Sequence, residues 1–234
     1  MAKECELTIL MPCLNEQKTI RTCIDKAFRF LNENNINGEI LISDNGSTDK
    51  SVNIADKCGA RVIKVKERGY GRVLTEGIKM SKGRYVIIGD CDESYDFLDI
   101  MKFLIKLREG YDLVVGNRFK GEIKKGAMPL LHRYFGTPVI SYIGKVIYKS
   151  DVGDYNCGLR GFKREAILNI KLTSNGMEYA SEMIIKATLN NLKIAEVPIT
   201  LYKDGRLGPS HLKTFRDGIR HLRILLFYWN IGRN

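Results

Sequence analysis

The chain has 234 residues, of which 44% are hydrophobic, so it can bury the core of one large soluble domain. Its net charge of +11 favours an anionic partner, either a phosphorylated substrate or an anionic membrane surface, and the lack of zinc-finger, RNP-like and helix-turn-helix patterns argues against nucleic acid. The sequence shows no signal peptide, no run of about 18 apolar residues and no CxxC pair among its six cysteines, which predicts a cytoplasmic protein without structural zinc.

Strand and helix patterns alternate through the first hundred residues. Apolar runs predict strands over 6–11, 39–43, 61–65 and 84–88, and apolar spacing predicts helices over 16–31, 69–80 and from Ser47 or Thr48 to Cys58. This alternation is typical of right-handed crossovers and predicts an α/β fold with a mainly parallel central sheet flanked by helices. Ligands of such sheets bind beyond the carboxyl ends of the strands, where Asn15, Asp44, Asp90 and Asp92 would gather.

The second half of the chain is less regular and contains no linker or internal repeat. Its patterns predict helices over 97–107, 163–170 and 178–190, strands over 111–116 and 193–197, and loops over 117–127 and 151–161. Residues 128–149 form a further predicted helix, with breaks at Gly136, Pro138 and Gly144. We therefore expect one large domain over residues 1–210, followed by a helical segment over 211–234.

The segment YVIIGDCDESYD, residues 85–96, takes an apolar strand directly into Asp90 and Asp92. Because side chains alternate along an extended chain, the two carboxylates project to the same side. Two anions held together repel each other unless a cation lies between them, and hard oxygen ligands suit Mg²⁺ or Mn²⁺. The pair therefore predicts a divalent metal site, and the alternative is an exposed acidic turn.

Residues 211–230 are predicted to form a helix with two different sides. One side is apolar and the other basic: Leu212, Phe215, Ile219, Leu222, Leu226 and Trp229 against Lys213, Arg216, Arg220 and Arg223. A basic amphipathic helix with aromatic residues at its end suits an anionic membrane surface. The alternative interpretation is a helix whose apolar side packs on the preceding domain while its charges face water.

The order of the motifs narrows the function. Neither GxGxxG nor GxxxxGK[ST] follows the first predicted strand, which argues against an NAD-dependent enzyme and a P-loop ATPase. Instead MPCLNE, SDNGSTD and RGYGRVLTEGIKMSKGRYVIIGDCDES follow one another, and in this order they resemble glycosyltransferase family 2, which has the GT-A fold. The resemblance covers nearly the whole chain and is best to the polyprenyl-phosphate branch, that is, the dolichol-phosphate mannose or glucose synthase-like enzymes.

The resemblance implies an activity. Residues 1–210 would be a GT-A catalytic domain that moves a hexose, with inversion, from a UDP- or GDP-linked donor to polyprenyl phosphate, using Mg²⁺ or Mn²⁺. Such an enzyme would act in the cell envelope, at the cytoplasmic face of the membrane. The sequence favours uridine only weakly and does not identify the sugar. Asn45 stands where the family usually has a second acidic residue, which implies altered contacts to the base and ribose.

The resemblance also implies a role for each matching residue. The implied catalytic residues are Asp90, Asp92, Asp154 and Arg160, with Asp90 and Asp92 as the metal ligands. The implied donor-binding residues are Pro12, Asn15, Glu16, Asp44, Arg68 and Asp90. Arg118 and Arg133 would hold the acceptor phosphate, and Arg206, His211 and Lys213 are candidates in a loop that closes over the site.

Several alternatives remain open at this stage. A phosphate acceptor is largely dianionic at neutral pH and needs no strong base, whereas a hydroxyl acceptor on a glycan, peptide or small molecule needs one, for which Asp154 or Glu182 is the candidate. Asp44 can instead cap the turn that follows it, and Arg118 and Arg133 can be solvated surface charges. Nucleotidylyl transfer and a non-catalytic basic scaffold are the less favoured functions, the first because no Gly-rich basic loop follows the first strand.

Overall fold

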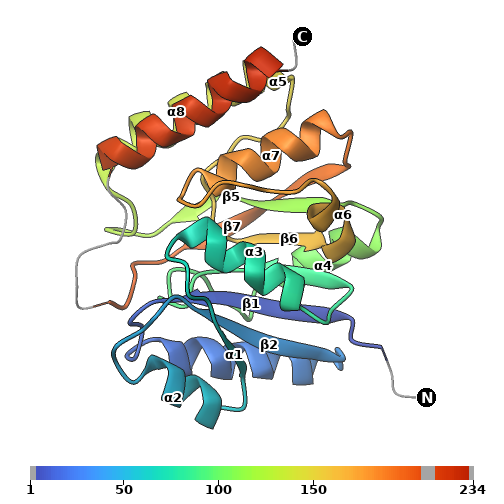
Figure 1. Ribbon diagram of the computed structural model, residues 1–234, viewed down its shortest axis with the longest axis vertical. Helices are drawn as coiled ribbons and strands as arrows, with labels where there is room; N and C mark the ends of the chain where they lie inside the picture. The colour runs from blue at the N-terminus through green and yellow to red at the C-terminus, as the bar shows by residue number, and fades with distance from the viewer. Residues whose placement is uncertain (1–3, 207–213, 232–234) are drawn as a thin grey trace.

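Seven strands form one sheet across residues 4–206 and 214–231, which the computed structural model describes (Figure 1). Their order across the sheet is β3-β2-β1-β4-β6-β5-β7, and only β6 runs antiparallel to its neighbours, β4 and β5. The strands are β1 (Leu7–Cys13), β2 (Gly38–Asp44), β3 (Arg61–Lys64), β4 (Tyr85–Ile88), β5 (Leu113–Ile123), β6 (Arg160–Lys163) and β7 (Ile194–Leu201). The predicted α/β fold with a mainly parallel sheet is confirmed.

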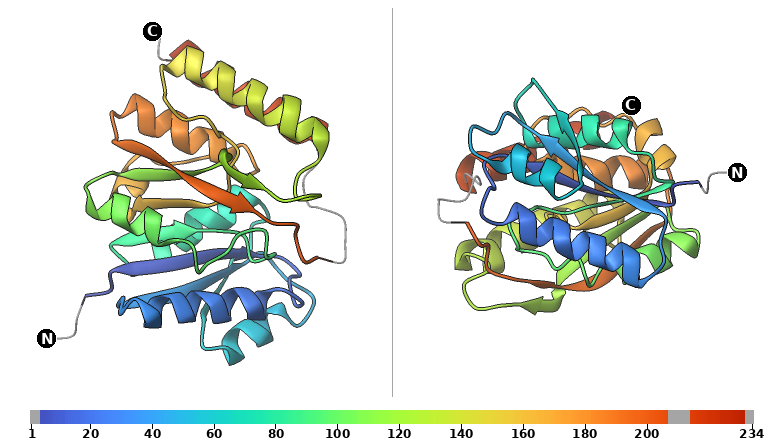
Figure 2. Two further views of the ribbon diagram at one scale, coloured as in Figure 1. Left: turned by 180° about the vertical axis from the view of Figure 1, so that it is seen from behind. Right: turned by 90° about the horizontal axis from the view of Figure 1, so that it is seen from below.

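Helices cover both faces of this sheet. α3 and α7 lie in front of it in Figure 1, and α1 and α4 come to the front when the molecule is seen from behind (Figure 2). The helices are α1 (Ile20–Glu33), α2 (Ser51–Lys57), α3 (Tyr70–Met80), α4 (Met101–Arg108), the π-helix η1 (His132–Gly136), α5 (Thr137–Tyr148), α6 (Arg164–Asn169), α7 (Tyr179–Leu189) and α8 (Thr214–Ile231).

The centre of the sheet forms the core beneath the site. β1 lies between β2 and β4, and its Leu7, Ile9 and Leu10 side chains are completely buried because helices cover both faces. Val86 and Ile87 of β4 are equally buried. Each such side chain stabilises the fold by ~1.5–3 kcal/mol. The carboxyl ends of β1, β2 and β4 therefore form a firmly held edge from which the loops of the site extend.

Two predicted loops contain strand residues. Residues 117–123, expected in a basic loop, continue β5 and pair with β7 beyond a register shift between Asn117 and Glu122. Two of their polar side chains, Lys120 and Glu122, are exposed, as is compatible with a strand that is not covered on both faces. Residues 160–163, expected between a loop and a helix, form β6. With only four residues, β6 is too short for its apolar pattern to be recognised.

The first helices begin later than predicted, and the long helix is divided. α1 starts at Ile20 instead of residue 16, and α2 starts at Ser51 instead of Ser47 or Thr48. Within 128–149, the expected break at Gly136 is the junction between η1 and α5. Pro138 is tolerated in the first turn of α5, where its missing N–H has no helical partner. The break expected at Gly144 is absent, because this glycine instead lets α5 pack against the ring of Tyr155.

α8 packs on α5 and α7, and α5 lies behind α8 in Figure 1 and in front of it in the left view of Figure 2. Among residues 216–230 of α8, the buried side chains are Asp217, His221 and Leu225. Tyr148 of α5 donates a hydrogen bond to the Leu225 carbonyl, and His221 Nδ1 lies 2.8 Å from the hydroxyl oxygen of Ser181. On the apolar side of α8, Ile219, Leu222, Leu226 and Trp229 are exposed, which disagrees with the alternative interpretation that this side packs on the preceding domain.

Candidate active site

A cavity of about 720 Å³ lies beyond the carboxyl ends of β1, β2 and β4. Its walls come from distant parts of the chain, namely the loop after β1, the start of α3, residues 173–178 and the first half of α8. Its charged lining residues are Glu16, Arg68, Asp90, Glu178, Arg206, Arg216, Asp217 and Arg220. The predicted position of the site at the carboxyl edge of the sheet agrees with this cavity.

Asp90 and Asp92 come together directly after β4. The Tyr70 hydroxyl donates to Asp90 Oδ1 at 3.0 Å, and Ser94 donates its N–H and its hydroxyl to Asp92 Oδ1 at 3.0 and 2.5 Å. Burial and the neighbouring charge of Asp92 raise the pKa of Asp90 to about 6. A Cβ at Gly158 would touch the Asp90 carboxylate, so this position needs glycine for the close approach of its loop.

Arg206 supplies a positive charge to these carboxylates. Its guanidinium lies 2.6 Å from Glu16 Oε1 and 3.1 Å from Asp92 Oδ2, and the Gly205 N–H donates to the Asp92 carbonyl at 2.8 Å. Burial raises the pKa of Glu16 to about 7, against the opposing effect of Arg206. Burial opposes the charge of Arg206, but Asp92 and Glu16 raise its pKa. The Arg206 guanidinium therefore lies between the loop that carries Glu16 and the loop that carries Asp92.

The acidic pair fits a divalent cation. Within residues 4–206 and 214–231, no three His, Cys, Asp or Glu side chains converge on one point, so the candidate protein ligands are the two aspartates. Two carboxylates with open positions beside them are a donor set that Mg²⁺ and Mn²⁺ accept when substrate phosphates complete the shell. The pKa of Asp90 is raised although Arg206 lies beside Asp92, so the two carboxylates would be stabilised by a further positive charge.

The predicted donor-binding residues differ in where their side chains point. Pro12, Glu16 and Arg68 line the cavity. Asp44 accepts hydrogen bonds from the N–H groups of Gly46 and Ser47, which is the turn-capping alternative. The Asn15 side-chain oxygen likewise accepts from the N–H groups of residues 48 and 49. These two side chains shape the loop after β2, and any contact with a base stays a prediction.

Arg118 is engaged with Asp154. Its Nε and Nη2 each donate to the Asp154 carboxylate at 2.7 Å, and the Asp154 side chain is completely buried. Burial opposes the charge of Arg118, but the adjacent carboxylate raises its pKa. The pair joins β5 to the loop before β6, and neither residue lines the cavity. The interpretation of Arg118 as a solvated surface charge is therefore wrong.

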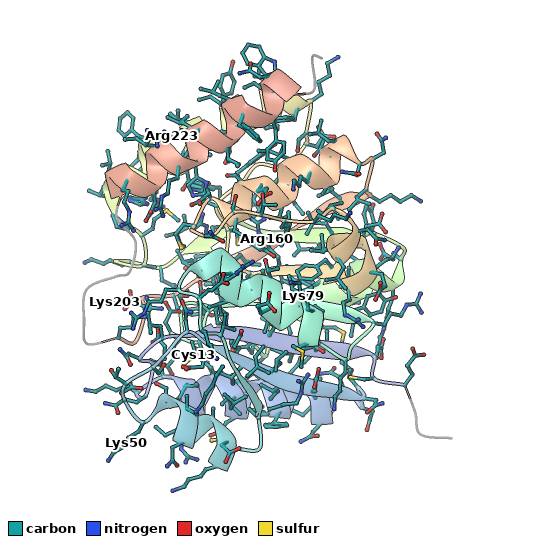
Figure 3. The ribbon with its side chains drawn as sticks, viewed as in Figure 1. Cys13, Lys50, Lys79, Arg160, Lys203 and Arg223 are labelled. Carbon is teal, nitrogen blue, oxygen red and sulfur yellow. The ribbon has the colours of Figure 1, made fainter. Side chains whose placement is uncertain are left out.

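Arg160 and Glu182 are also internally satisfied. Arg160, labelled in Figure 3, is 1% exposed and donates to the carbonyls of Cys157, Ala180 and Tyr155 at 2.5–2.8 Å. Burial lowers the pKa of Arg160. The Glu182 carboxylate accepts from the N–H groups of residues 173 and 174, from the Tyr228 hydroxyl and from Lys186. Both side chains hold loops in place, and neither lines the cavity.

The remaining predicted residues lie apart from the cavity or outside the described residues. Arg133 lies on η1, with its guanidinium 5.6 Å from the centre of the Tyr134 ring. His211 and Lys213 fall outside the described residues. Arg206 is thus the member of the predicted closing loop that the structure brings to the site.

Two parts of the cavity wall, residues 173–178 and the first half of α8, contain no sequence motif that predicts their place in the site. Residues 173–178 lie against the start of α3, where Gly71 donates its N–H to the Asn175 carbonyl at 3.0 Å. A Cβ at Gly69 or Gly71 would collide with this segment, so the glycines of RGYGR allow the close approach. Arg216 and Arg220 belong to the predicted basic side of a helix, and the sequence gives no sign that they turn toward the cavity.

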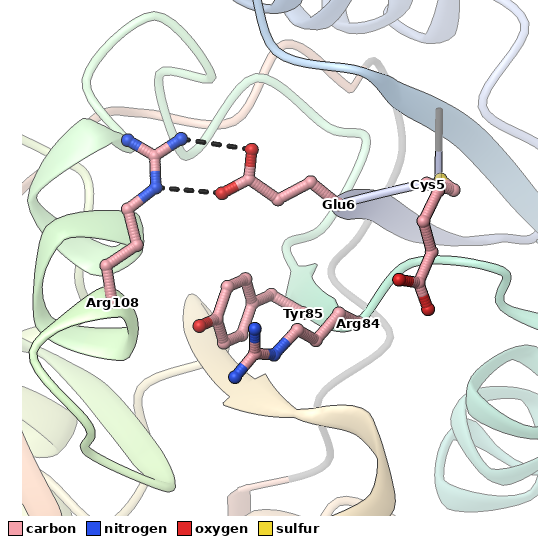
Figure 4. A pocket seen from close by; sticks show the side chains of 6 residues that line it. Cys5, Glu6, Arg84, Tyr85 and Arg108 are labelled. Carbon is pink, nitrogen blue, oxygen red and sulfur yellow. Dashed lines mark hydrogen bonds and ion pairs between the residues drawn. The ribbon is translucent and has the colours of Figure 1, made fainter. Parts of the chain in front are cut away.

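A second cavity, of about 380 Å³, lies at the opposite end of the sheet (Figure 4). Its charged side chains are largely satisfied, because Arg108 donates to both carboxylate oxygens of Glu6 at 2.8 and 3.0 Å. Arg84 lies over the ring of Tyr85, with 5.3 Å from its guanidinium carbon to the ring centre. This arrangement joins α4 to the start of β1 and has no convergent carboxylates of the kind found at Asp90 and Asp92.

The family model named glycosyl transferase family 2 matches residues 8–170, which contain β1 to β6 and the paired aspartates. The chain belongs to glycosyltransferase family 2. This membership confirms the family that the order of the sequence motifs predicts.

Two curated relatives extend the match. The low-salt glycan biosynthesis hexosyltransferase Agl6 of Haloferax volcanii is 39% identical over 221 residues, which are 94% of this chain and 53% of that protein. A dolichyl-phosphate hexose transferase of the same organism is 32% identical over 215 residues, which are 91% of this chain and 89% of that protein. This family 2 glycosyltransferase thus spans about half the length of the first relative and most of the second.

Solved structures share the fold. Glucosyl-3-phosphoglycerate synthase from Mycobacterium tuberculosis, in complex with Mn²⁺, UDP-glucose and phosphoglyceric acid, superposes with a TM-score of 0.76 at 20% identity, covering 96% of this chain and 80% of that one. The same enzyme with phosphoglyceric acid gives a TM-score of 0.74 at 21% identity, covering 95% and 79%. The predicted GT-A fold is confirmed by this likeness.

Proposed function

We propose that this glycosyltransferase is an inverting, metal-dependent enzyme that transfers a hexose from a nucleotide diphosphate sugar, with uridine as the favoured base, to polyprenyl phosphate. The observation that carries the proposal is the pair Asp90 and Asp92 at a cavity rich in arginine. A cavity with paired carboxylates and several arginines suits the transfer of a sugar from the diphosphate of a donor to the phosphate of an acceptor. The similarity to a dolichyl-phosphate hexose transferase supports the acceptor, and the likeness to a structure with UDP-glucose supports the donor.

The carboxylates of Asp90 and Asp92 would hold Mg²⁺ or Mn²⁺. The cation would neutralise the negative charge that develops on the leaving nucleoside diphosphate. Arg206 can share this task, because its guanidinium already contacts Asp92. Once a cation is bound to Asp92, Arg206 can turn from the carboxylates to the phosphates of the donor.

The nucleotide end of the cavity would be formed by the loops after β1, β2 and β3. Pro12, Glu16 and Arg68 line this part, and Asp44 and Asn15 would act by fixing the loop beside it. Asn45 also lines the cavity, and its side-chain amide donates to the Glu67 carbonyl at 2.9 Å while accepting from the Gly69 N–H at 2.9 Å. In this way Asn45 fixes the segment that carries Arg68.

A phosphate acceptor needs no strong base. With a second pKa near 6 it is largely dianionic at neutral pH, and its oxygen can attack the anomeric carbon directly. Asp154 and Arg160 would then act by holding the loop before β6 in place. Gly158 of this loop lies against the Asp90 carboxylate. Arg118 could contact the acceptor only after parting from Asp154, and Arg133 only from outside the cavity.

One observation favours the alternative acceptor, a hydroxyl group. The candidate bases Asp154 and Glu182 are both engaged in hydrogen bonds. Glu178, however, lines the cavity, and its Oε2 is buried without a hydrogen-bond partner among the described residues. A carboxylate in that position could accept the proton of a hydroxyl acceptor. The two acceptor classes therefore differ in their need for Glu178.

We also propose that the enzyme works at the cytoplasmic face of an anionic membrane, in cell-envelope synthesis. The exposed apolar side of α8 lies beside exposed apolar residues of η1 and α5, among them Phe135, Val139, Tyr142 and Val146. An apolar surface next to the cavity suits a lipid-linked acceptor. Among the described helices, none combines the length and the apolar character needed to span a bilayer.

The test is a transfer assay with a radiolabelled UDP-hexose and Mn²⁺, in which polyprenyl phosphate is compared with the corresponding polyprenol. The proposal predicts a labelled glycosyl phospholipid of inverted anomeric configuration, formed by wild type and by Glu178→Gln at similar rates, and no product from polyprenol. Transfer to polyprenol that is lost in Glu178→Gln would establish the hydroxyl alternative instead.

A further inference from the structure

α8 contributes two arginines to the end of the cavity that lies away from β1 and β2. Arg216 and Arg220 are four residues apart and therefore lie on one side of the helix. Both line the cavity that also contains Asp90. α8 lies beyond α7, on the side of the sheet away from β2 and β3 (Figure 1). The cavity thus extends from the nucleotide end, past Asp90, to these two arginines.

The two guanidinium groups are held in place without being saturated. Asp217 lies between them, and its Oδ1 is 3.5 Å from Arg216 Nε and 3.8 Å from Arg220 Nη1. These distances are longer than the 2.7 Å contacts that join Arg118 to Asp154. A guanidinium carries five N–H donors, so one carboxylate shared by two guanidinium groups leaves several donors for a ligand.

The exposure of the three side chains supports a ligand-binding role. Asp217 is only 4% exposed, whereas Arg216 is 54% and Arg220 42% exposed. The buried carboxylate therefore orients two cations whose outer ends remain accessible. Gly176 faces this end, since a Cβ there would touch Arg220 Nη1 and the Glu178 carboxylate. The absence of a side chain at Gly176 keeps room next to Arg220.

We propose that Arg216 and Arg220 bind the phosphate group of the acceptor, a phosphate monoester, at the end of the cavity opposite the nucleotide. The inference rests on the proposed transfer to a phosphate. Two guanidinium groups offer paired donors to the several oxygens of one phosphate, which a single cation cannot match. The Glu178 carboxylate lies beside Arg220 at Gly176 and balances part of the charge of the two arginines. Arg118 is less suited, because it does not line the cavity and its Nε and Nη2 are both bonded to Asp154.

The experiment compares Arg216→Gln, Arg220→Gln and the double variant with wild type and with Arg223→Gln. Arg223 is the matched control, since it is an exposed arginine of the same helix that does not line the cavity (Figure 3). Farnesyl phosphate and phosphoglyceric acid are the two acceptors, so that a lipid phosphate and a soluble phosphate are separated. The readouts are the KM for each substrate and acceptor binding by titration calorimetry in the presence of UDP and Mn²⁺.

The expected result is that each single variant raises the KM and Kd for the accepted phosphate at least about tenfold, as loss of a charge-assisted hydrogen bond does. The double variant has the largest effect, while the donor KM and the Arg223→Gln values change less than about twofold. Melting temperatures should be retained, because the arginines are exposed. Variants that keep the wild-type acceptor KM, or raise only the donor KM, would overturn the inference and leave the transfer reaction intact.

The calorimetric measurement of acceptor binding separates this inference from the proposed function. If wild type binds a phosphate through the arginine pair but transfers no sugar to it, the phosphate site stands and the transferase proposal for that acceptor fails. A preference for phosphoglyceric acid that depends on the pair would support the site with a soluble acceptor. If wild type binds neither phosphate, the arginine site is excluded.

Discussion

Two arginine–carboxylate clusters near the site differ in what they leave for a ligand. Arg118 and Asp154 form a bidentate pair with two contacts of 2.7 Å, away from the cavity. Arg206 is shared between Glu16 and Asp92, lines the cavity, and leaves Glu16 with a pKa of about 7. We call Arg118 and Asp154 the closed pair, because the two side chains bond each other away from the cavity. We call Arg206, Glu16 and Asp92 the open cluster, because its arginine is shared and reaches the cavity. In the sequence, both arginines belong to predicted loops, and nothing there distinguishes the one that a carboxylate satisfies from the one that reaches the cavity.

The largest expected effect concerns the closed pair. Asp154→Asn leaves the buried Arg118 without its counter-ion, so the free energy of unfolding should fall by about 3–5 kcal/mol. Urea denaturation measures this change. Asp99→Asn is the control, because Asp99 pairs with Lys102 at the surface and its loss should cost less than about 1 kcal/mol. Equal losses in the two variants would contradict the description of a closed pair.

A pH-dependent stability term is expected beneath α8. His221 is buried beside Arg160, and burial followed by the charge of Arg160 lowers its pKa to about 4. Between pH 6.5 and 4 the unfolded chain binds more protons at this residue, so its contribution is complete above pH 6.5 and is lost as the pH falls toward 4.

The contribution of His221 is measurable by difference. The stability of wild type minus that of His221→Gln should fall by about 3 kcal/mol between pH 6.5 and pH 4, since each pKa unit is worth 1.36 kcal/mol. Subtraction removes the opposite effects of Glu16 and Asp90, whose pKa values are raised. A difference that does not change with pH would mean that His221 titrates normally.

Asp90, which lies next to the open cluster, should make metal binding depend on pH. Asp90 has a pKa of about 6, and it must lose its proton to bind a cation. The affinity for Mn²⁺ should therefore rise by about tenfold per pH unit below pH 6 and level off above it. Isothermal titration at pH 5, 6, 7 and 8 tests this expectation. Constant affinity across the series would show that the Asp90 carboxylate takes no part.

The smallest expected effect comes from Arg206. Arg206→Gln removes the positive charge beside Asp92, so Mn²⁺ alone should bind a few-fold more tightly, by up to about 1 kcal/mol. The nucleotide sugar should bind the Mn²⁺-loaded variant more weakly, because a partner of its phosphates is lost. Arg72→Gln, which breaks a surface pair with Glu67, is the control. Weaker Mn²⁺ binding in Arg206→Gln would refute the view of Arg206 as a competing cation.

Much of the fold, and the part of the cavity wall that follows the first strands, could be predicted from the sequence for a physical reason. β1 and β4 are buried on both faces, so their continuous apolar runs are visible, and Asp90 and Asp92 follow β4 directly in the chain. Such local signals do not depend on the rest of the molecule. The motifs of the first hundred residues therefore predict that the acidic pair lies beyond the carboxyl end of a buried strand, and in the structure the pair follows β4.

The other half of the cavity depends on long-range packing. Arg216 and Arg220 reach it because α8 packs on α5 and α7, and residues 173–178 because Gly69 and Gly71 leave them space. The antiparallel strand β6 is equally invisible, since four residues give too little pattern. Arg118, Arg160 and Glu182 show the converse, because the sequence reveals a charge but not the internal partner that satisfies it.

The most direct test of the account is the stabilisation of the protein by UDP-glucose with and without Mn²⁺, measured as a melting temperature for wild type, Asp92→Asn and the surface control Asp99→Asn. The account predicts that UDP-glucose raises the Tm of wild type and Asp99→Asn in the presence of Mn²⁺, beyond any rise that Mn²⁺ alone causes, and that it raises neither the Tm without Mn²⁺ nor the Tm of Asp92→Asn. An equal rise in Asp92→Asn, or no rise in wild type with any UDP- or GDP-hexose up to millimolar concentration, would contradict it.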